Sequence, residues 1–129
     1  MQGEVPDVVA YGPAGSHHLV TGEVLGQDPL ARYGPRAAPD LLRAASLEHA
    51  GDLLLVSSVD DAGLVHAFEG LVGSHGGLGG AQNEAMLLYP ASLRVMGARE
   101  DVGGTRMLVG AEAVHGELVG WLRELGVRT

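Results

Sequence analysis

Residues 36–58, RAAPDLLRAASLEHAGDLLLVSS, place an amphipathic helical pattern directly before an apolar run. Within Arg36–Ser46 the apolar residues recur on one helical face: Ala38, Leu41, Leu42 and Ala45. Pro39 then falls in the first turn, where its missing N–H costs nothing. Asp52–Ser58 is almost continuously apolar, as expected of a strand that is covered on both faces. A helix followed by a buried strand predicts the α/β class.

Shorter strands are expected on both sides of this segment. They are Asp7–Tyr11, His17–Val20, Glu23–Leu25, Leu64–Phe68 and Ala85–Tyr89. Thr21-Gly22 suits a tight hairpin because glycine tolerates a positive φ. A turn is expected at Asp60–Gly63, and Ser92–Met107 is expected to be a polar excursion that is most flexible at Gly103-Gly104.

The clearest helix is Glu112–Leu125. Its apolar stripe has helical spacing: Val114, Leu118, Trp121, Leu122 and Leu125. Glu112 and Glu117 lie early and Arg123 late, which suits the helix dipole, and Gly126 is placed to cap the helix. Residues 1–129 are therefore predicted to form one α/β domain with a central helix and a C-terminal amphipathic helix.

Composition excludes several classes of protein. The chain has 129 residues, 46% apolar, with 16 acidic residues against 8 basic ones, and all eight are arginine. A net charge of −8 without an arginine cluster disfavours nucleic-acid binding. The chain has no cysteine, and its apolar runs are far shorter than the roughly 18 residues of a membrane span. Its N-terminal residues do not resemble a signal peptide, so we expect a cytoplasmic protein without a membrane partner.

Histidines are the candidate ligands for a metal, but none lies in a local zinc motif. His17 and His18 are neighbours on a predicted strand, so they point to opposite faces and are expected to have a surface role. Structural or solvent roles are expected for His49 and His66, and His115 is expected to be an interfacial residue at the edge of the apolar stripe of the C-terminal helix.

His75 differs because of its neighbours, Gly73-Ser74-His75-Gly76-Gly77. Glycines let a ligand approach the backbone closely, so this loop could present the imidazole to a metal. By composition alone, a flexible turn with an incidental histidine remains the simpler interpretation, because a glycine-rich run is weak evidence.

The stretch Phe68–Gly80, FEGLVGSHGGLGG, is followed by Gln82 and by Met86–Pro90. It resembles the C-terminal part of bacterial phosphodiesterases of the alkaline phosphatase superfamily, in the branch that includes the nucleotide pyrophosphatase/phosphodiesterases. The resemblance extends in the same order over most of residues 3–125, and its most specific parts are the GSHGG loop and Gly110–His115, GAEAVH.

This resemblance implies that residues 1–129 form a single C-terminal lobe of the superfamily's fold, with a short mixed sheet. It also implies that His75 is the last histidine ligand of one of two catalytic metals, zinc being the usual metal. Gly73, Ser74, Gly76 and Gly77 would form the backbone of the metal loop. Two metals of this kind clamp a phosphoryl group, activate a Ser or Thr nucleophile and stabilise the leaving oxygen.

The rest of the superfamily's site does not match this sequence. No Asp-His-Gly tripeptide and no Asp-x-x-x-His motif occurs, and no nucleophile can be assigned. Asn83-Glu84-Ala85 also departs from the family pattern. One histidine is a poor metal site by itself, since catalytic zinc takes three protein ligands and a water.

Three hypotheses follow. The chain could be the C-terminal portion of a metal-dependent phosphoric ester hydrolase, inactive alone and completed by an N-terminal catalytic lobe. It could be a non-catalytic interaction module that covers its apolar faces by forming a homo-oligomer. A small independent enzyme using Asp60 or Asp61 with His66 is the weakest, because those residues are typical of a turn.

Overall fold

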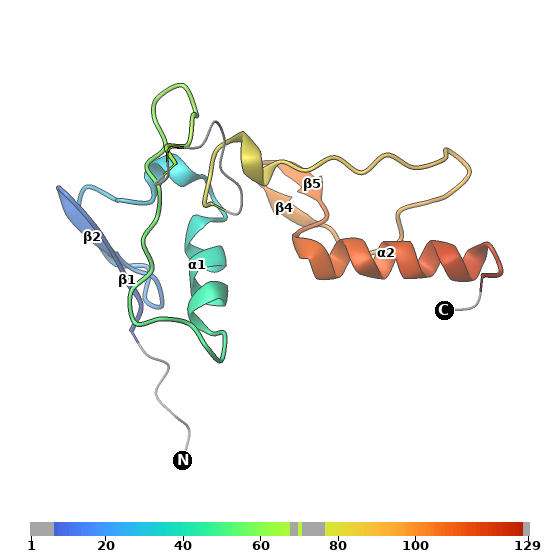
Figure 1. Cartoon of the computed structure of the whole chain (residues 1–129), viewed down its shortest axis with the longest axis horizontal. Helices are drawn as coiled ribbons and strands as arrows, with labels where there is room; N and C mark the ends of the chain where they lie inside the picture. The colour runs from blue at the N-terminus through green and yellow to red at the C-terminus, as the bar shows by residue number, and fades with distance from the viewer. Residues whose placement is uncertain (1–6, 68–69, 71–76, 128–129) are drawn as a thin grey trace, which may run out of the picture. The chain divides into compact units, whose positions relative to one another are not determined.

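A computed structural model describes residues 7–67, 70 and 77–127 (Figure 1). The chain divides into two compact units, residues 1–85 and residues 86–129. We call them the N-terminal and the C-terminal unit and describe each by itself.

The N-terminal unit contains a three-stranded antiparallel sheet in the order β1 (Val9–Gly12), β2 (Gly15–His18) and β3 (Val24–Gly26). Ala10 pairs with His17, and His17 in turn pairs with Val24. The predicted strand near the N-terminus and the predicted hairpin are confirmed, with shifted bounds. Gly22 has a φ of +76° in the hairpin loop, the conformation for which glycine was expected there.

Helix α1 (Ala37–Ala45) follows the 3-10 turn η1 (Ala31–Tyr33) and confirms the predicted helix. It supplies half of a small buried core, which consists of Leu19, Leu30, Ala37 and Leu41. Partly buried side chains surround this core, and they come from the sheet, from α1 and from two later segments, represented by Val56 and Leu78. The N-terminal unit is therefore organised around the inner face of α1.

The strand predicted at Asp52–Ser58 is wrong. This run forms no ladder, and Leu53 and Leu55 are 88% and 78% exposed. The pattern required cover on both faces, whereas the described residues offer the run no neighbouring strand, and Val56 alone among its apolar residues reaches the core cluster.

The turn predicted at Asp60–Gly63 is confirmed. The Gly63 N–H donates to the Asp60 carbonyl at 3.0 Å, and the carboxylate of Asp60 accepts the N–H groups of Ala62 and Leu64. The strand predicted to follow it is reduced to an isolated bridge between Val59 and Val65. The unit closes with η2 (Ala81–Asn83).

The C-terminal unit begins with another missing strand. Ala85–Tyr89 is extended without strand pairing, and Met86 and Leu88 are 89% and 90% exposed. The predicted polar excursion instead contains a hairpin, β4 (Glu100–Val102) with β5 (Thr105–Met107). Gly103 and Gly104 both have positive φ in its two-residue turn, which corrects the flexible loop expected there.

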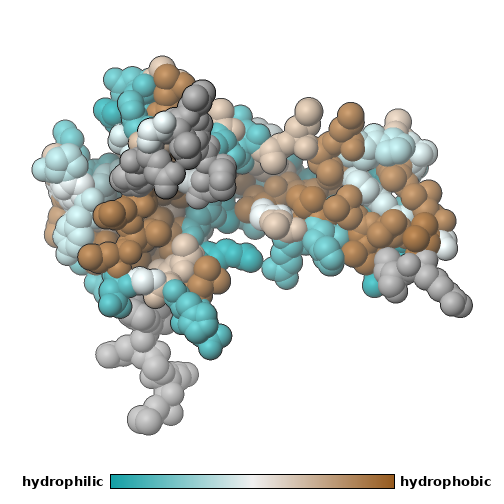
Figure 2. Space-filling model, in the orientation of Figure 1, coloured by the Kyte–Doolittle hydropathy of each residue, from teal (hydrophilic) through white to brown (hydrophobic). Residues whose placement is uncertain are grey.

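Helix α2 (Gly110–Glu124) confirms the predicted C-terminal helix. The Gly126 N–H donates to the Arg123 carbonyl and the Val127 N–H to the Leu122 carbonyl, with Gly126 at a φ of +73°. These two bonds form a Schellman motif, so Gly126 caps the helix as predicted. Of the predicted stripe Trp121 is buried, whereas Leu118, Leu122 and Leu125 are exposed. Figure 2 shows hydrophobic side chains on the surface of both units.

The chain is therefore of mixed α and β content, with two small antiparallel sheets and two helices. Every strand pair among the described residues is antiparallel, in place of the mixed sheet that was expected. None of the helices in this part of the chain has the length and apolar character needed to cross a bilayer.

Candidate functional site

The predicted metal loop lies almost entirely outside the described residues. Gly73, Ser74, His75 and Gly76 belong to the undescribed segment 71–76, and the description resumes at Gly77. The role of His75 therefore stays a prediction, and the structure bears on it only through the segment that follows.

That segment, residues 77–83, is fixed by Asn83. In the amide orientation that satisfies both partners, the Asn83 side chain donates to the Gly77 carbonyl at 3.1 Å and accepts the Gly79 N–H at 2.7 Å. One side chain thus bridges two backbone groups of the glycine-rich run. Asn83 is one of the residues that depart from the family pattern, and here it holds the end of the loop.

Close backbone packing fixes the same segment on its other side. Gly79 is buried at a φ of +74°, and a Cβ there would lie 2.9 Å from the Tyr33 Cα. A Cβ on Gly80, which has a φ of +65°, would lie 2.9 Å from the Gly63 carbonyl oxygen. Leu78 packs against the core cluster. These glycines are needed because η1 and the Asp60–Gly63 turn approach the segment closely.

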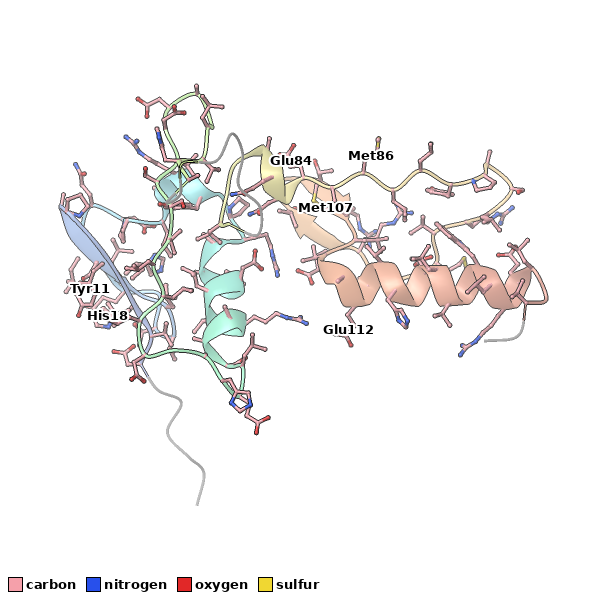
Figure 3. All side chains as sticks on the ribbon, in the orientation of Figure 1. Tyr11, His18, Glu84, Met86, Met107 and Glu112 are labelled. Atoms are coloured by element: carbon pink, nitrogen blue, oxygen red, sulfur yellow. The ribbon has the colours of Figure 1, made fainter. Side chains whose placement is uncertain are left out.

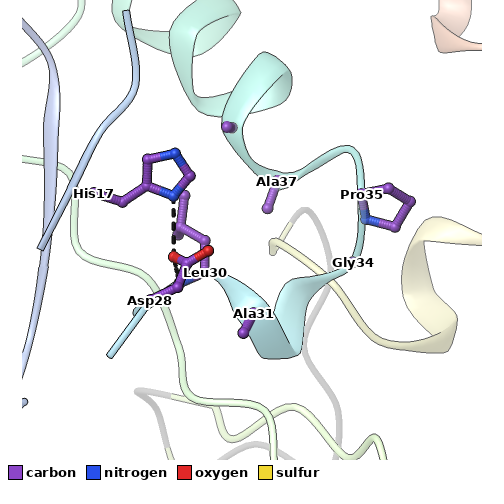
Figure 4. Close-up of a pocket in the computed structure, with 8 residues that line it drawn as sticks. His17, Asp28, Leu30, Ala31, Gly34, Pro35 and Ala37 are labelled. Carbon is purple, nitrogen blue, oxygen red and sulfur yellow. Dashed lines mark hydrogen bonds and ion pairs between the residues drawn. The ribbon is translucent and has the colours of Figure 1, made fainter. Parts of the chain in front are cut away.

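A second feature of the N-terminal unit is a pocket of about 400 Å³ beside β2 and the start of α1 (Figure 4). It is lined by His17, Asp28, Leu30, Ala31, Gly34, Pro35, Ala37 and Ala38. His17 Nδ1 lies 3.0 Å from Asp28 Oδ1, and the side chain of His17 is 16% exposed. The same Oδ1 accepts the Leu30 N–H at 2.8 Å.

The ionisation of Asp28 fixes the proton on His17. Burial disfavours the charged carboxylate, but the hydrogen bonds from Leu30 and His17 and the attraction to His17 outweigh it, so the pKa of Asp28 is lowered from 3.8. An ionised carboxylate only accepts hydrogen bonds, so Nδ1 of His17 must carry the proton. Figure 4 shows the other ring nitrogen, Nε2, turned away from Asp28.

The neighbouring His18 contacts a different aspartate, with Nδ1 3.0 Å from Asp7 Oδ2. It projects from the N-terminal sheet near Tyr11 (Figure 3). The two adjacent histidines thus have separate partners. The surface role predicted for His17 is wrong, because its side chain is mostly buried. Nothing in the local pattern pointed to this, since Asp28 comes beside His17 only after β3 has paired with β2.

The remaining described histidines lie at the surface. His49 and His115 are exposed. His66 Nε2 lies 3.9 Å from Asp60 Oδ2, while Oδ1 of Asp60 closes the turn. Within residues 7–67, 70 and 77–127, no group of three or more His, Asp or Glu side chains could hold a metal ion.

A buried carboxylate in the C-terminal unit was also missed. Glu117 is 4% exposed and accepts the N–H of Met96 at 3.0 Å and the N–H of Gly97. Trp121, one turn later, donates to the Arg94 carbonyl at 2.8 Å and stacks on Tyr89 with ring centroids 4.8 Å apart. These contacts bind residues 89–97 to α2, which gives Glu117 a structural role in place of the dipole role predicted from its position.

Comparison of the chain with known protein families, with curated proteins and with solved structures finds no match. The resemblance to the alkaline phosphatase superfamily therefore stays a prediction that rests on the residues quoted for it.

Proposed function

We propose that this chain corresponds to the C-terminal part of a metal-dependent phosphoric ester hydrolase, in which His75 supplies one metal ligand. The proposal is carried by the Gly73–Gly77 motif. Its structural support is that the segment at the end of this motif, residues 77–83, is held in place by its neighbours. A ligand needs a rigid backbone beside it, and the segment two residues after His75 is held by Asn83, Tyr33 and Gly63.

One imidazole does not make a catalytic metal site. Zinc in such sites takes three protein ligands and keeps one position for water. The described residues add no cluster of donors, so the remaining ligands and the nucleophile would come from protein outside this sequence. The chain's own contribution is the neutral His75 and the loop backbone that positions it, and turnover by the chain alone is expected to be negligible.

Paramagnetic broadening by Mn²⁺ tests the role of His75 directly. Titrated into the ¹⁵N-labelled chain, Mn²⁺ should broaden the amide signals of residues 73–77 before those near His66. The effect should disappear in His75→Ala and persist in His66→Ala, the matched control. Broadening centred on another histidine, or unchanged in His75→Ala, contradicts the proposal.

An activity assay tests the expected incompleteness. Hydrolysis of bis(p-nitrophenyl) phosphate with added zinc or manganese should stay at the level of the metal alone. Turnover that disappears in His75→Ala would show that this chain already holds a complete site, and the proposal of a missing lobe would then be wrong.

A second candidate function is a non-catalytic interaction module. The exposed side chains of Leu53–Leu55, and of Met86 and Leu88, favour it, because extended apolar segments without strand partners are typical of surfaces that another chain covers. The two candidates differ in their dependence on His75: association through these segments does not need it, whereas a role in a metal site does.

A further inference from the structure

Several backbone N–H groups that line the pocket beside His17 are already used in hydrogen bonds within the protein. Leu30, Ala31 and Ala37 all line it, and their N–H groups already donate to Asp28 or to the Gly34 carbonyl. Pro35 has no N–H to offer. Among the described residues of the lining, only His17 and Asp28 have polar side chains.

The Asp28 carboxylate presents an acceptor to a ligand. The two hydrogen bonds that described residues donate to the Asp28 carboxylate both reach Oδ1, and neither reaches Oδ2. His17 uses Nδ1 for Asp28 and thereby holds the carboxylate in place. The carboxylate also keeps a negative charge in the pocket.

The rest of the wall is made of small apolar groups. Ala31, Ala37 and Ala38 contribute methyl groups, and Leu30 and Pro35 contribute larger apolar side chains. A volume of about 400 Å³ suits a small molecule with a short hydrocarbon part.

We propose that this pocket binds a small alkylammonium ion, with its N–H groups on the Asp28 carboxylate and its alkyl part against the alanines. An ammonium group has three donors and no acceptor, which complements the acceptors of the pocket. The net charge of −8 adds long-range attraction for a cation. None of the described lining residues belongs to the His75 motif, and the proposal stands independently of the function proposed above.

Butylammonium chloride is the probe that tests this. Followed by ¹H–¹⁵N NMR on the full chain, it should cause saturable shifts at Leu30, Ala37 and Ala38, with a dissociation constant on the order of millimolar for so small a ligand. Butyrate and butanol at equal concentration and ionic strength are the matched probes. They keep the hydrocarbon part and replace the ammonium group by an anion or a neutral hydroxyl.

Two variants should weaken binding at least tenfold: Asp28→Asn, which removes the charge, and His17→Ala, which removes the imidazole that holds the carboxylate in place. His18→Ala, with its partner Asp7 outside the pocket, is the control and should bind as the wild type does. Ala38→Leu fills the pocket without touching the polar pair, so it decides the question if either polar variant fails to fold.

The proposal is overturned if butyrate or butanol shifts the same residues as strongly as butylammonium does. Unchanged binding in a folded Asp28→Asn or in Ala38→Leu overturns it as well, as does the absence of saturable shifts. None of these results involves His75, so failure here leaves the phosphoric ester hydrolase proposal to its own tests.

Discussion

At the scale of single residues, Asp28 connects its own loop to the N-terminal sheet. Its Oδ1 accepts a backbone N–H two residues later and an imidazole N–H from β2. The first bond shapes the turn that leads into η1, and the second ties that turn to the sheet. One carboxylate oxygen thereby links two parts of the N-terminal unit, and both links are stronger when the carboxylate is ionised.

Asp28 should therefore make stability depend on acid pH. Its pKa in the folded chain lies below the ordinary 3.8, so its contribution is complete above pH 3.8 and disappears as the pH falls through the folded value. The free energy of unfolding should be lower for Asp28→Asn than for the wild type at pH 6, and the difference should shrink below pH 3.8.

Urea unfolding followed through the NMR signals of α1 measures this difference. The other carboxylates are common to both proteins, so their titration cancels in the comparison. A difference that grows as the pH falls would show that Asp28 is not stabilised in its charged form.

At the scale of elements, α2 holds the segment before it through a carboxylate and an indole. Glu117 and Trp121 are one turn apart on the helix and reach residues 94–97 together. The fit leaves no space at Gly97, because a Cβ there would collide with the Glu117 carboxylate. A glycine in this loop is thus required by a neighbour and not by its own backbone angles.

Gly97→Ala should consequently destabilise the C-terminal unit. Displacing the buried carboxylate from its two N–H donors should cost about 1–3 kcal/mol. Trp121 is the chain's one tryptophan and is buried in this unit, so its fluorescence in a urea titration reports the change. A stability equal to that of the wild type would show that the carboxylate contact contributes little.

Gly116→Ala adds the same methyl group as Gly97→Ala, but it is expected to stabilise the protein. Gly116 lies inside α2, and no atom lies within 4 Å of an added Cβ. Alanine should raise the free energy of unfolding by about 0.5–1 kcal/mol, because it loses less backbone entropy in a helix. The Trp121 fluorescence measurement applies here too, and a loss of stability would mean that this face of α2 is covered.

The sequence was sufficient for elements that are determined locally. Helices α1 and α2, the cap at Gly126 and the turn at Asp60 follow from spacing and turn chemistry within a few residues. The apolar runs at 52–58 and 85–89 failed because a strand needs a partner, and hydrophobicity does not say whether one exists. The pairing of His17 with Asp28 could not be predicted either, since the two meet only through the register of a hairpin.

At the scale of the whole molecule, the apolar composition exceeds what the core uses. The chain is 46% apolar, yet the N-terminal core cluster has four buried residues, and three consecutive leucines at 53–55 are exposed. Exposed apolar runs of this kind favour association with another surface.

The purified chain should accordingly self-associate as its concentration rises. Light scattering should give a mass that increases with concentration, and the double variant Leu53→Glu/Leu55→Glu should lower the association, because charged side chains resist burial. Arg32→Glu, an exposed charge change outside the run, is the control. A wild-type chain that stays monomeric at all concentrations would contradict this expectation.

Deamidation of Asn83 would change the backbone contacts of residues 77–79. Deamidation would turn its side-chain NH₂, which faces the Gly77 carbonyl, into a carboxylate oxygen that repels that carbonyl. The bridge across residues 77–79 would open in the aged fraction of a sample while the amide-bearing fraction kept it. Freshly purified and stored protein would then differ at the exit of the His75 loop although their genes are identical.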